Sequence, residues 1–324
     1  MSRLSSYDGS FLHKALTDMV QIRRFEEMAA QMYGLRKIGG FCHLYNGQEA
    51  VAVGAVAALD LSKDYILTSY RDHGHALAVG MDPKVIMAEL FGKITGCSRG
   101  KGGSMHMFDV ERHFLGGNGI VGGQIPMAAG AAFKSMYTGD GGVTLCFFGD
   151  GAIHQGAFHE TLNLAKIWNL PIVFIVENNQ FGMGTAVKRI SGVEDFSVKA
   201  QGYNLQGRVV NGMDVLDVYD AIKEVTDDSR KNGNAWLLDI KTYRYKGHSM
   251  SDPAKYRTKD ELESYKQQDP IVQLKEQMIE AKMITEAEYK KVDTAAKELV
   301  QAAVEFAENS EEPALHTMYE DILA

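Results

Sequence analysis

The stretch VTLCFFGDGA, residues 143–152, decides the fold of this chain. A short apolar run leads directly into Gly-Asp-Gly, and a second apolar run, residues 171–176, leads into ENNQFG. Such runs are typical of buried parallel strands. Residues 153–169 between them are long enough for the crossover helix that parallel strands need. The sequence therefore predicts an α/β fold with a mostly parallel sheet.

Polar side chains follow both predicted strands at their carboxyl ends. Asp150 follows the first strand, and Asn178 and Asn179 follow the second. Open α/β sheets bind ligands at this edge, and carboxylate and amide oxygens suit Mg²⁺ or Ca²⁺. Gly149 and Gly151 let the backbone approach a bound group, and the amides of the following helix would face an anion. The pattern predicts a metal together with a phosphate.

A second Gly-Asp-Gly, residues 139–141, has Asn169 at nearly the same spacing. It precedes its strand instead of following it, and Asn169 ends a helix just before Pro171. We therefore expect a surface turn at Asp140. The alternative for Asp150 is a turn or helix-cap aspartate, which the Asn-Asn pair at the next strand end disfavours.

The composition restricts the class of protein. With 324 residues, 45% of them hydrophobic, the chain can bury a sizeable core in one large domain or two small ones. Its net charge is −8 and its basic residues do not cluster, which argues against a nucleic-acid partner. No apolar run approaches the roughly 18 residues that cross a membrane. Three cysteines without metal or redox spacing, and residues 1–13 unlike a targeting peptide, predict a cytoplasmic protein.

Other elements follow from apolar periodicity and from glycine and proline positions. We expect helices at residues 16–33, 48–59, 83–91, 125–137 and 215–230, strands at residues 65–69, 201–210 and 236–243, and a charged helical segment at residues 260–308 with breaks near Pro270 and Thr285. Residues 96–124 are rich in glycine and show no periodicity. A loop of this length inside a compact domain is usually functional.

Within that loop, GNGIVG at residues 117–122 matches the dinucleotide pattern G-x-G-x-x-G. The pattern requires a strand immediately before it, a helix after it and an acidic residue at a strand end about 20 residues later. We expect no buried strand at residues 111–115 and find no such acidic residue. A glycine-rich cradle for another cofactor is therefore favoured over a nicotinamide or flavin site.

Six further side chains at strand ends or on loops can carry chemistry. Arg71 follows a predicted strand and suits a phosphate, although a surface ion pair is the alternative. His43 and His248 lie on loops and can stabilise an anion or move a proton, although structural roles are common for histidine. His73 and His75 are equally compatible with a structural and a chemical role. The role of His106 stays open.

These motifs together resemble the alpha subunits of the thiamine-diphosphate-dependent 2-oxo acid dehydrogenases. The resemblance extends from about residue 22 to about residue 270, and Gly-Asp-Gly followed by Asn-Asn is the cofactor motif of such enzymes. It is greatest to the pyruvate dehydrogenase alpha subunits, and the stretches that carry it are residues 40–50, 69–71, 101–107, 116–122 and 243–253. Alpha subunits of acetoin and branched-chain 2-oxo acid dehydrogenases are alternatives. A scaffold that has lost its cofactor is an alternative of another class.

The resemblance implies a role for individual residues. Mg²⁺ would be bound by the side chains of Asp150 and Asn179 and by the carbonyl oxygen of Phe181. Thiamine diphosphate would contact Tyr70, Arg71, Gly119, Val121, Gly149, Asp150, Gly151, Ala152, Asn179 and His248. Pyruvate would face His43, Tyr70 and Gly117, and the implied catalytic residues are His43 and His248. Ser249 matches a phosphorylation position of animal members, which alone says nothing about regulation here.

The resemblance also implies partners. Such an enzyme decarboxylates pyruvate and transfers the acetyl group to a lipoyl carrier, the acetyltransferase component of the complex. The carboxylate that activates the cofactor comes from a second α/β domain, and this sequence holds one. We therefore expect a beta subunit, an α₂β₂ heterotetramer, and no nucleic-acid or membrane partner. We expect a bacterial protein with a single α/β domain, extended by helices at residues 1–40 and 260–324.

Overall fold

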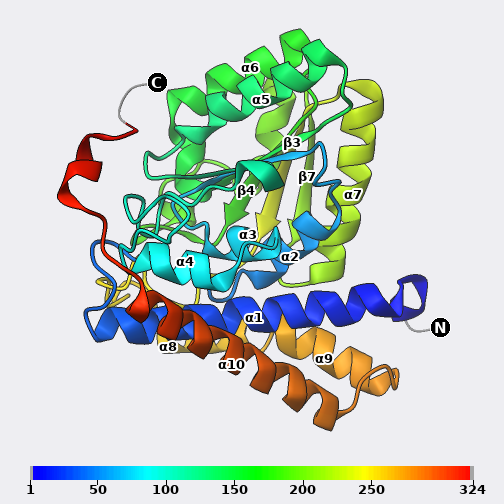
Figure 1. Ribbon diagram of the computed structural model, residues 1–324. Coiled ribbons are helices and arrows are strands. Elements are labelled where there is room, and N and C mark those ends of the chain that lie inside the picture. Colours follow the sequence, from blue (N-terminus) through cyan, green and yellow to red (C-terminus); the bar gives the residue numbers. More distant parts are fainter. Residues whose placement is uncertain (1–2, 322–324) are drawn as a thin grey trace.

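The computed structural model describes residues 3–321 (Figure 1). Its centre is a six-stranded sheet in the order β2-β1-β3-β4-β8-β7, and every neighbouring pair of strands is parallel. The strands of this sheet are β1 (Tyr65–Ser69), β2 (Phe114–Asn118), β3 (Thr144–Gly149), β4 (Ile172–Asn178), β7 (Gln206–Asn211) and β8 (Trp236–Lys241). A small antiparallel pair, β5 (Phe181–Gly182) and β6 (Thr185–Ala186), follows β4. The predicted α/β fold with a mostly parallel sheet is confirmed.

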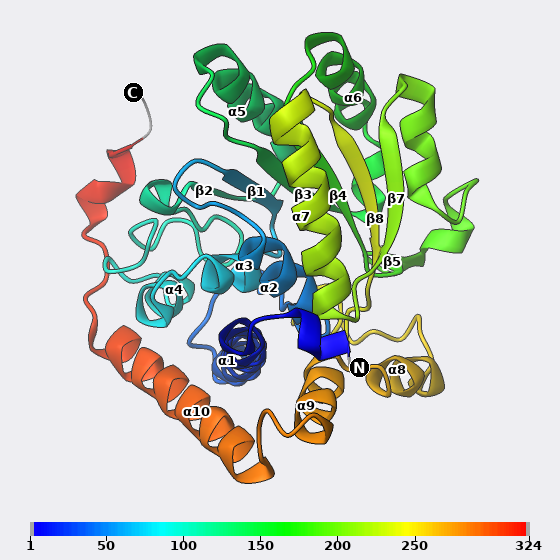
Figure 2. The ribbon, with the colours of Figure 1, turned by 90° about the vertical axis from the view of Figure 1, so that its right-hand side faces the viewer.

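Helices cover both faces of the sheet (Figures 1 and 2). They are α1 (Gly9–Gly34), α2 (Glu49–Ala57), α3 (His73–Ala78), α4 (Pro83–Leu90), α5 (Gln124–Thr138), α6 (Gly156–Trp168), α7 (Val215–Asn232), α8 (Lys259–Lys266), α9 (Pro270–Glu280) and α10 (Glu286–Asn309). Short 3₁₀ helices lie at η1 (Arg3–Ser6), η2 (Val110–Arg112), η3 (Asp150–His154), η4 (Val187–Arg189), η5 (Phe196–Tyr203) and η6 (Leu315–Tyr319).

The sheet separates two hydrophobic cores. On one face, α5 and α6 pack with Cys146, Phe148 and Phe174 of the central strands. On the other face, α1, α2 and α7 pack with Leu145 and Phe147. Successive strand residues point to opposite faces. Both faces are covered, which explains why β3 and β4 are continuous apolar runs.

The strand register brings the predicted ligand residues to one edge. Gly149 at the end of β3 lies opposite Glu177 of β4, and Asn178 lies opposite Lys241 of β8. The chain then continues from β3 through η3 into α6, which is the crossover helix expected at residues 153–169. The carboxyl ends of β3, β4 and β8 therefore lie together, as the sequence predicted.

Caps set the helix boundaries in the C-terminal segment. The side chain of Asp269 accepts the backbone N–H groups of Ile271 and Val272, and Pro270 occupies the first turn of α9. Thr285 and Glu288 form a reciprocal capping box at the start of α10. The breaks predicted near Pro270 and Thr285 are confirmed. The division of the chain into one domain with two helical extensions stays a prediction.

Three expectations for local structure were wrong. Residues 114–118 form the edge strand β2, although we expected no strand at residues 111–115; its FLGGN sequence has little β propensity, and β1 beside it supplies the pairing. Residues 201–205 are not extended, because η5 occupies residues 196–203 and the strand begins at Gln206. Helix α3 was missed because nearly all of its short sequence is buried, so no polar face alternates with an apolar one.

No helix between residues 3 and 321 combines the length and the apolar character needed to span a bilayer.

Candidate active site

A cavity of about 270 Å³ opens at the carboxyl ends of β1, β3 and β4. Nine of the predicted site residues line it, namely Tyr70, Arg71, Val121, Gly149, Asp150, Gly151, Ala152, Asn179 and Phe181. They come from four separate segments of the chain, which parallel strand pairing brings together. Gly117, Gly119, His43 and His248 do not line this cavity.

The Gly149-Asp150-Gly151 turn leaves its backbone open to the cavity. A Cβ atom at Gly149 would have no neighbour within 4 Å among the described residues, and one at Gly151 would approach only the Gly182 Cα, at 3.8 Å. The turn leads into η3, so its N–H groups belong to the start of a helical segment. Such a turn can accommodate a phosphate group at close range.

Asp150 is the only carboxylate of this turn, and it is 2% exposed. Its Oδ2 atom has no hydrogen-bond partner within residues 3–321. Burial raises the pKa of Asp150 to about 6, despite the nearby guanidinium of Arg244. A buried carboxylate oxygen without a partner is costly unless a ligand satisfies it. This oxygen is suited to a cation.

Asn179 and the Phe181 carbonyl supply the other two expected metal ligands. The Asn179 side-chain N–H donates to Gln48 Oε1 (2.9 Å), which directs the amide oxygen away from Gln48. The guanidinium of Arg244 lies 3.4 Å from Asn179 Oδ1 and 3.1 Å from the Phe181 carbonyl oxygen. Both oxygens therefore already face a positive group of the chain. The three oxygen donors fit a hard cation such as Mg²⁺.

Arg71 contributes positive charge to the cavity wall. It is 4% exposed and donates to the carbonyl oxygens of Leu44 (2.6 Å) and His248 (2.8 Å). Burial and the neighbouring Arg244 lower the pKa of Arg71 to about 10, so it remains charged at neutral pH. Arg71 holds the two loops that carry His43 and His248 and presents its charge to the same cavity, as a phosphate-binding residue would.

Three aromatic rings form a cluster beside the cavity. The His43 ring lies 4.6 Å from Tyr70 and 5.2 Å from His248, measured between centroids, and Tyr70 lies 5.5 Å from His248. Burial lowers the pKa of His43 to about 2 and that of His248 to about 4, with Arg71 as the next cause in both cases. Both imidazoles are therefore neutral at pH 7. The Nδ1 atom of each has no hydrogen-bond partner in the described part of the chain.

The two glycines of the glycine-rich loop have other surroundings. A Cβ atom at Gly117 would lie 2.0 Å from Asp72 Oδ2, and one at Gly119 would lie 3.2 Å from His106 Nε2. Gly117 is thus required by the close approach of Asp72. The roles in substrate and cofactor binding implied for Gly117 and Gly119 stay predictions.

Sequence reasoning missed several residues of the cavity wall, above all Glu177 and Arg244. Tyr45 OH donates to the Glu177 carboxylate, and burial raises the pKa of Glu177 to about 7. The available signal was a charged residue inside the apolar run of β4. Arg244 has a similar signal, because it follows β8 at the same sheet edge. Asp140 of the second Gly-Asp-Gly lies in an exposed turn, as predicted, where it accepts the Gly142 N–H. It also pairs with Lys134 (2.5 Å).

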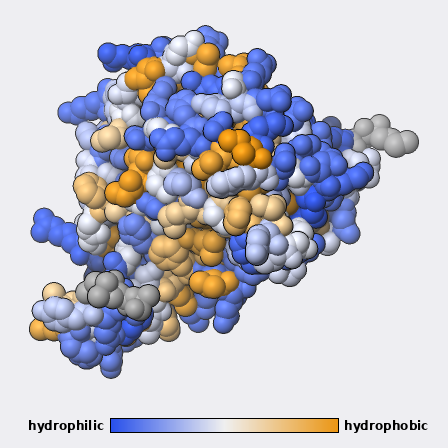
Figure 3. Space-filling model, turned by 90° about the horizontal axis from the view of Figure 1, so that it is seen from above, coloured by the Kyte–Doolittle hydropathy of each residue, from blue (hydrophilic) through white to orange (hydrophobic). Residues whose placement is uncertain are grey.

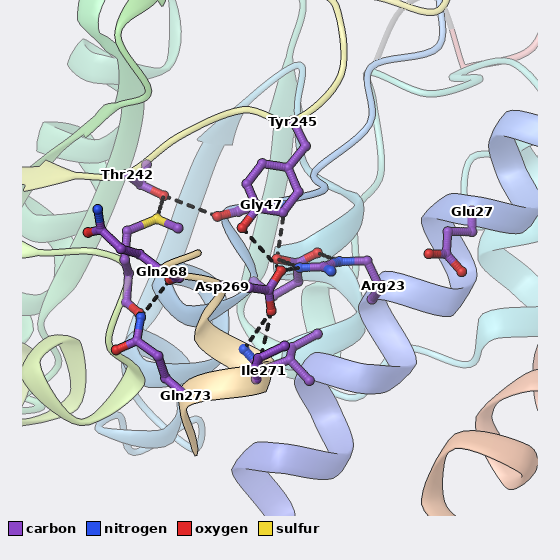
Figure 4. Close-up of polar contacts among 12 residues, drawn as sticks. Arg23, Glu27, Gly47, Thr242, Tyr245, Gln268, Asp269, Ile271 and Gln273 are labelled. Carbon is purple, nitrogen blue, oxygen red and sulfur yellow. Dashed lines mark hydrogen bonds and ion pairs between the residues drawn. The ribbon is translucent and has the colours of Figure 1, made fainter. Parts of the chain in front are cut away.

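A buried ion cluster supports the loop next to Arg244 (Figure 4). Arg23 of α1 donates to both carboxylate oxygens of Glu49, at 2.5 and 3.0 Å, and to Asp269 at 2.9 Å. The Tyr245 hydroxyl donates to the same Asp269 oxygen (3.1 Å), and the Gly47 N–H donates to Glu49 (2.9 Å). We call Arg23, Glu49, Asp269 and Tyr245 the Arg23 cluster. It connects α1, α2 and α9 to the segment that carries His248.

The comparisons with known proteins agree with this geometry. The family model "Dehydrogenase E1 component" matches residues 17–316. The protein named "Pyruvate dehydrogenase E1 component subunit alpha" of Rickettsia bellii (strain RML369-C) is 47% identical over 95% of this chain and 94% of its own length. The proteins of the same name from Rickettsia prowazekii (strain Madrid E) and Rhizobium meliloti (strain 1021) are each 48% identical, over 95% and 96% of this chain and 94% and 89% of their own lengths. The chain belongs to the dehydrogenase E1 component family, whose members depend on thiamine diphosphate.

Proposed function

We propose that this chain is the alpha subunit of a pyruvate dehydrogenase E1 component, an enzyme that decarboxylates pyruvate and transfers the acetyl group to a lipoyl carrier. One observation carries the proposal: the unpartnered Asp150 oxygen lies in a cavity with Asn179, Phe181 and Arg71, at the ligand-binding edge of the sheet. The names of the most similar relatives support pyruvate as the substrate.

Asp150, Asn179 and the Phe181 carbonyl would hold Mg²⁺ in this enzyme, and the turn at residues 149–152 with Arg71 would hold the diphosphate. Bound thiamine diphosphate supplies the carbon nucleophile and the electron sink for decarboxylation. Arg71, together with a cation held by these three oxygens, would neutralise the charge of the diphosphate. Since Arg244 already lies against two of the three oxygens, its contacts have to adjust when a cation binds there.

The ring cluster of His43, Tyr70 and His248 forms the substrate side of the proposed site. Neutral imidazoles next to Arg71 can accept or donate a hydrogen bond without adding charge. His43 would hold the pyruvate, and His248 would contact both diphosphate and substrate. The tilted and edge-to-face rings would also limit the water that reaches the reacting carbon.

A beta subunit completes the proposed site. The loop at the cavity mouth exposes Ile120 (74%) and Val121 (44%), which a partner would cover. Apolar side chains are also exposed along α5 and α6, and they gather on the face seen in Figure 3. They are Met127, Phe133, Met136, Tyr137, Leu164, Ile167 and Trp168. Exposed apolar side chains of this kind favour a protein partner. We propose an α₂β₂ heterotetramer, and cytoplasmic location stays a prediction.

The test measures cofactor binding by the chain co-expressed with its beta subunit. Asp150→Ala should reduce Mg²⁺-dependent affinity for thiamine diphosphate by about 100-fold or more, because a charged ligand is lost. Asp140→Ala, in the exposed second Gly-Asp-Gly, is the matched control and should bind normally. Normal binding by Asp150→Ala would refute the metal site, and no binding by the wild-type pair would favour a non-catalytic scaffold.

The substrate is tested separately on the reconstituted enzyme. With pyruvate, acetoin and branched-chain 2-oxo acids compared side by side, pyruvate should give the highest kcat/KM. A higher value for acetoin or for a branched-chain acid would replace the proposed substrate and leave the cofactor site intact.

A further inference from the structure

The carboxylate of Glu26 is buried in the apolar face of α1. Glu26 is 0% exposed and lies between the buried residues Phe25 and Ala29. In Figure 2, which looks along α1, this helix packs beneath α2 and α3. A buried carboxylate costs stability unless hydrogen bonds and an opposite charge compensate for it. The partners of Glu26 therefore indicate what it does.

Both Glu26 oxygens are used, and neither contact is to α1 itself. Glu26 Oε1 accepts the backbone N–H of Tyr45 at 2.7 Å. Glu26 Oε2 lies 2.9 Å from Nδ1 of His73, at the start of α3. The other ring nitrogen of His73, Nε2, lies 2.9 Å from Ser104 Oγ in the glycine-rich loop. Ser104 Oγ in turn accepts the backbone N–H of His43 at 3.1 Å.

Glu26, His73 and Ser104 thus connect α1, α3 and the glycine-rich loop to the segment at residues 43–45. This segment lies in the loop between α1 and α2, where no helix or strand ladder occupies its N–H groups. One carboxylate fixes it twice, directly at Tyr45 and through His73 and Ser104 at His43. Buried N–H groups need such partners. The His43 ring, held at this point, lies against Tyr70 and His248.

The order carboxylate, imidazole, hydroxyl is that of a hydrolase triad, but the surroundings exclude that role. Ser104 is 3% exposed and does not line the cavity at Asp150, and its oxygen accepts a main-chain N–H group. Burial opposes the charge on His73, but the Glu26 carboxylate raises the pKa of His73 above its usual value. The two ring nitrogens of His73 thus connect Glu26 to Ser104.

We propose that Glu26 and His73 are positioning residues, which hold the main chain at His43 and Tyr45 so that the His43 ring keeps its place in the substrate pocket. The inference rests on the proposed function, in which His43 faces pyruvate. Neither residue lines the cavity with Asp150, so their effect should be on the substrate and not on cofactor affinity.

The experiment is a double-mutant cycle in the enzyme reconstituted with its beta subunit. Glu26→Gln and His73→Asn should each lower kcat/KM for pyruvate by about tenfold to 100-fold, since small displacements at a reacting centre have effects of this size. The dissociation constant of thiamine diphosphate should stay within about twofold. In a His43→Ala background, Glu26→Gln should have little further effect on kcat/KM, because the residue on which it acts is gone.

Two controls keep the outcomes distinct. Asp64→Asn also changes a buried carboxylate, which accepts the N–H groups of Asp60 and Val143 at the opposite end of the sheet, and it should leave the kinetics unchanged. Ser104→Ala removes only one hydroxyl and replaces Glu26→Gln in the cycle if that variant does not fold. If His43→Ala has no effect, the proposed role of His43 fails. If His43→Ala lowers kcat/KM, and Glu26→Gln lowers kcat/KM by the same factor in the His43→Ala background as in the wild type, the positioning role is refuted.

Discussion

The cavity wall around Asp150 and the Arg23 cluster bury similar groups in opposite ways. Two neighbouring residues separate the regions: Arg244 lines the cavity, and Tyr245 belongs to the Arg23 cluster. In the Arg23 cluster every charged group has an opposite charge at 2.9 Å or closer. Asp150 Oδ2 has no partner anywhere in residues 3–321. A charge satisfied within the chain maintains the fold, whereas an unsatisfied one marks the place of a ligand.

Cavity size does not favour the site over the Arg23 cluster. The cavity beside Arg23 measures about 510 Å³, against about 270 Å³ at Asp150. The larger cavity is lined by Arg23, Arg24, Glu27 and Asp269, whose charges are engaged with other side chains. Unsatisfied polar atoms are therefore the better guide to the site here.

The largest expected change in the free energy of unfolding comes from a substitution in the Arg23 cluster. Arg23→Met leaves Glu49 and Asp269 buried without a counter-charge and should lower the free energy of unfolding by about 3–5 kcal/mol. Lys14→Met, which breaks only the exposed pair with Asp18, should change it by less than about 0.5 kcal/mol. Urea unfolding of the chain co-expressed with its beta subunit measures both. A loss below about 1 kcal/mol for Arg23→Met would show that the cluster does not maintain the fold.

An intermediate effect on the free energy of unfolding is expected at His75. This side chain is buried, lies outside the cavity and has no hydrogen bond from its ring nitrogens in the described chain. Burial lowers the pKa of His75 to about 3. Between pH 6.5 and 3 the unfolded chain therefore binds a proton that the folded chain does not. Stability from this group is complete above pH 6.5 and falls by about 1.4 kcal/mol per pH unit as the pH decreases.

The variant His75→Phe tests this explanation. It should reduce the slope of unfolding free energy against pH by about 1.4 kcal/mol per unit between pH 6.5 and 5. Its ring would still pack between Tyr45 and Phe147. An unchanged slope would mean that His75 is protonated in the folded state, with Glu177 at 3.6 Å as its partner.

The smallest expected effect is a gain of stability at Asp150. Without cofactor and metal, Asp150→Asn should raise the free energy of unfolding by about 1 kcal/mol, because a buried carboxylate with one unpartnered oxygen becomes neutral. Asp140→Asn, at the exposed turn, should give no gain. Thermal unfolding with and without Mg²⁺ and thiamine diphosphate measures both variants. A loss of stability for cofactor-free Asp150→Asn would mean that the carboxylate is satisfied within the chain.

The central unit of the fold was predictable because its signals are local. Apolar runs end at Gly149 and Glu177, and the strand context separates Asp150 from Asp140. The edge strand β2 was not predictable in the same way, since Phe114–Asn118 forms a strand only through pairing with β1. Tertiary pairing overrides weak propensity at such positions.

The functional residues that were missed have distant partners. Arg244 reaches the Phe181 carbonyl, 63 residues away, and Glu26 reaches His73, 47 residues away. A side chain's partner across such a separation is fixed by the assembled sheet and helices, and no periodicity records it. The buried position of Glu26 was visible only as an acidic residue beside Phe25 in an apolar helix face.

The all-parallel order of the sheet has a consequence for how the chain reaches this structure. No two neighbouring strands in the six-stranded sheet are joined by a hairpin, and Ile66 of β1 pairs with Leu145 of β3 and Phe114 of β2. Each pairing requires closure of a long segment before its contacts are gained, and such topologies fold slowly. The exposed apolar side chains of α5 and α6 then remain open to aggregation for longer. Synthesis together with the beta subunit should therefore increase the yield of folded chain.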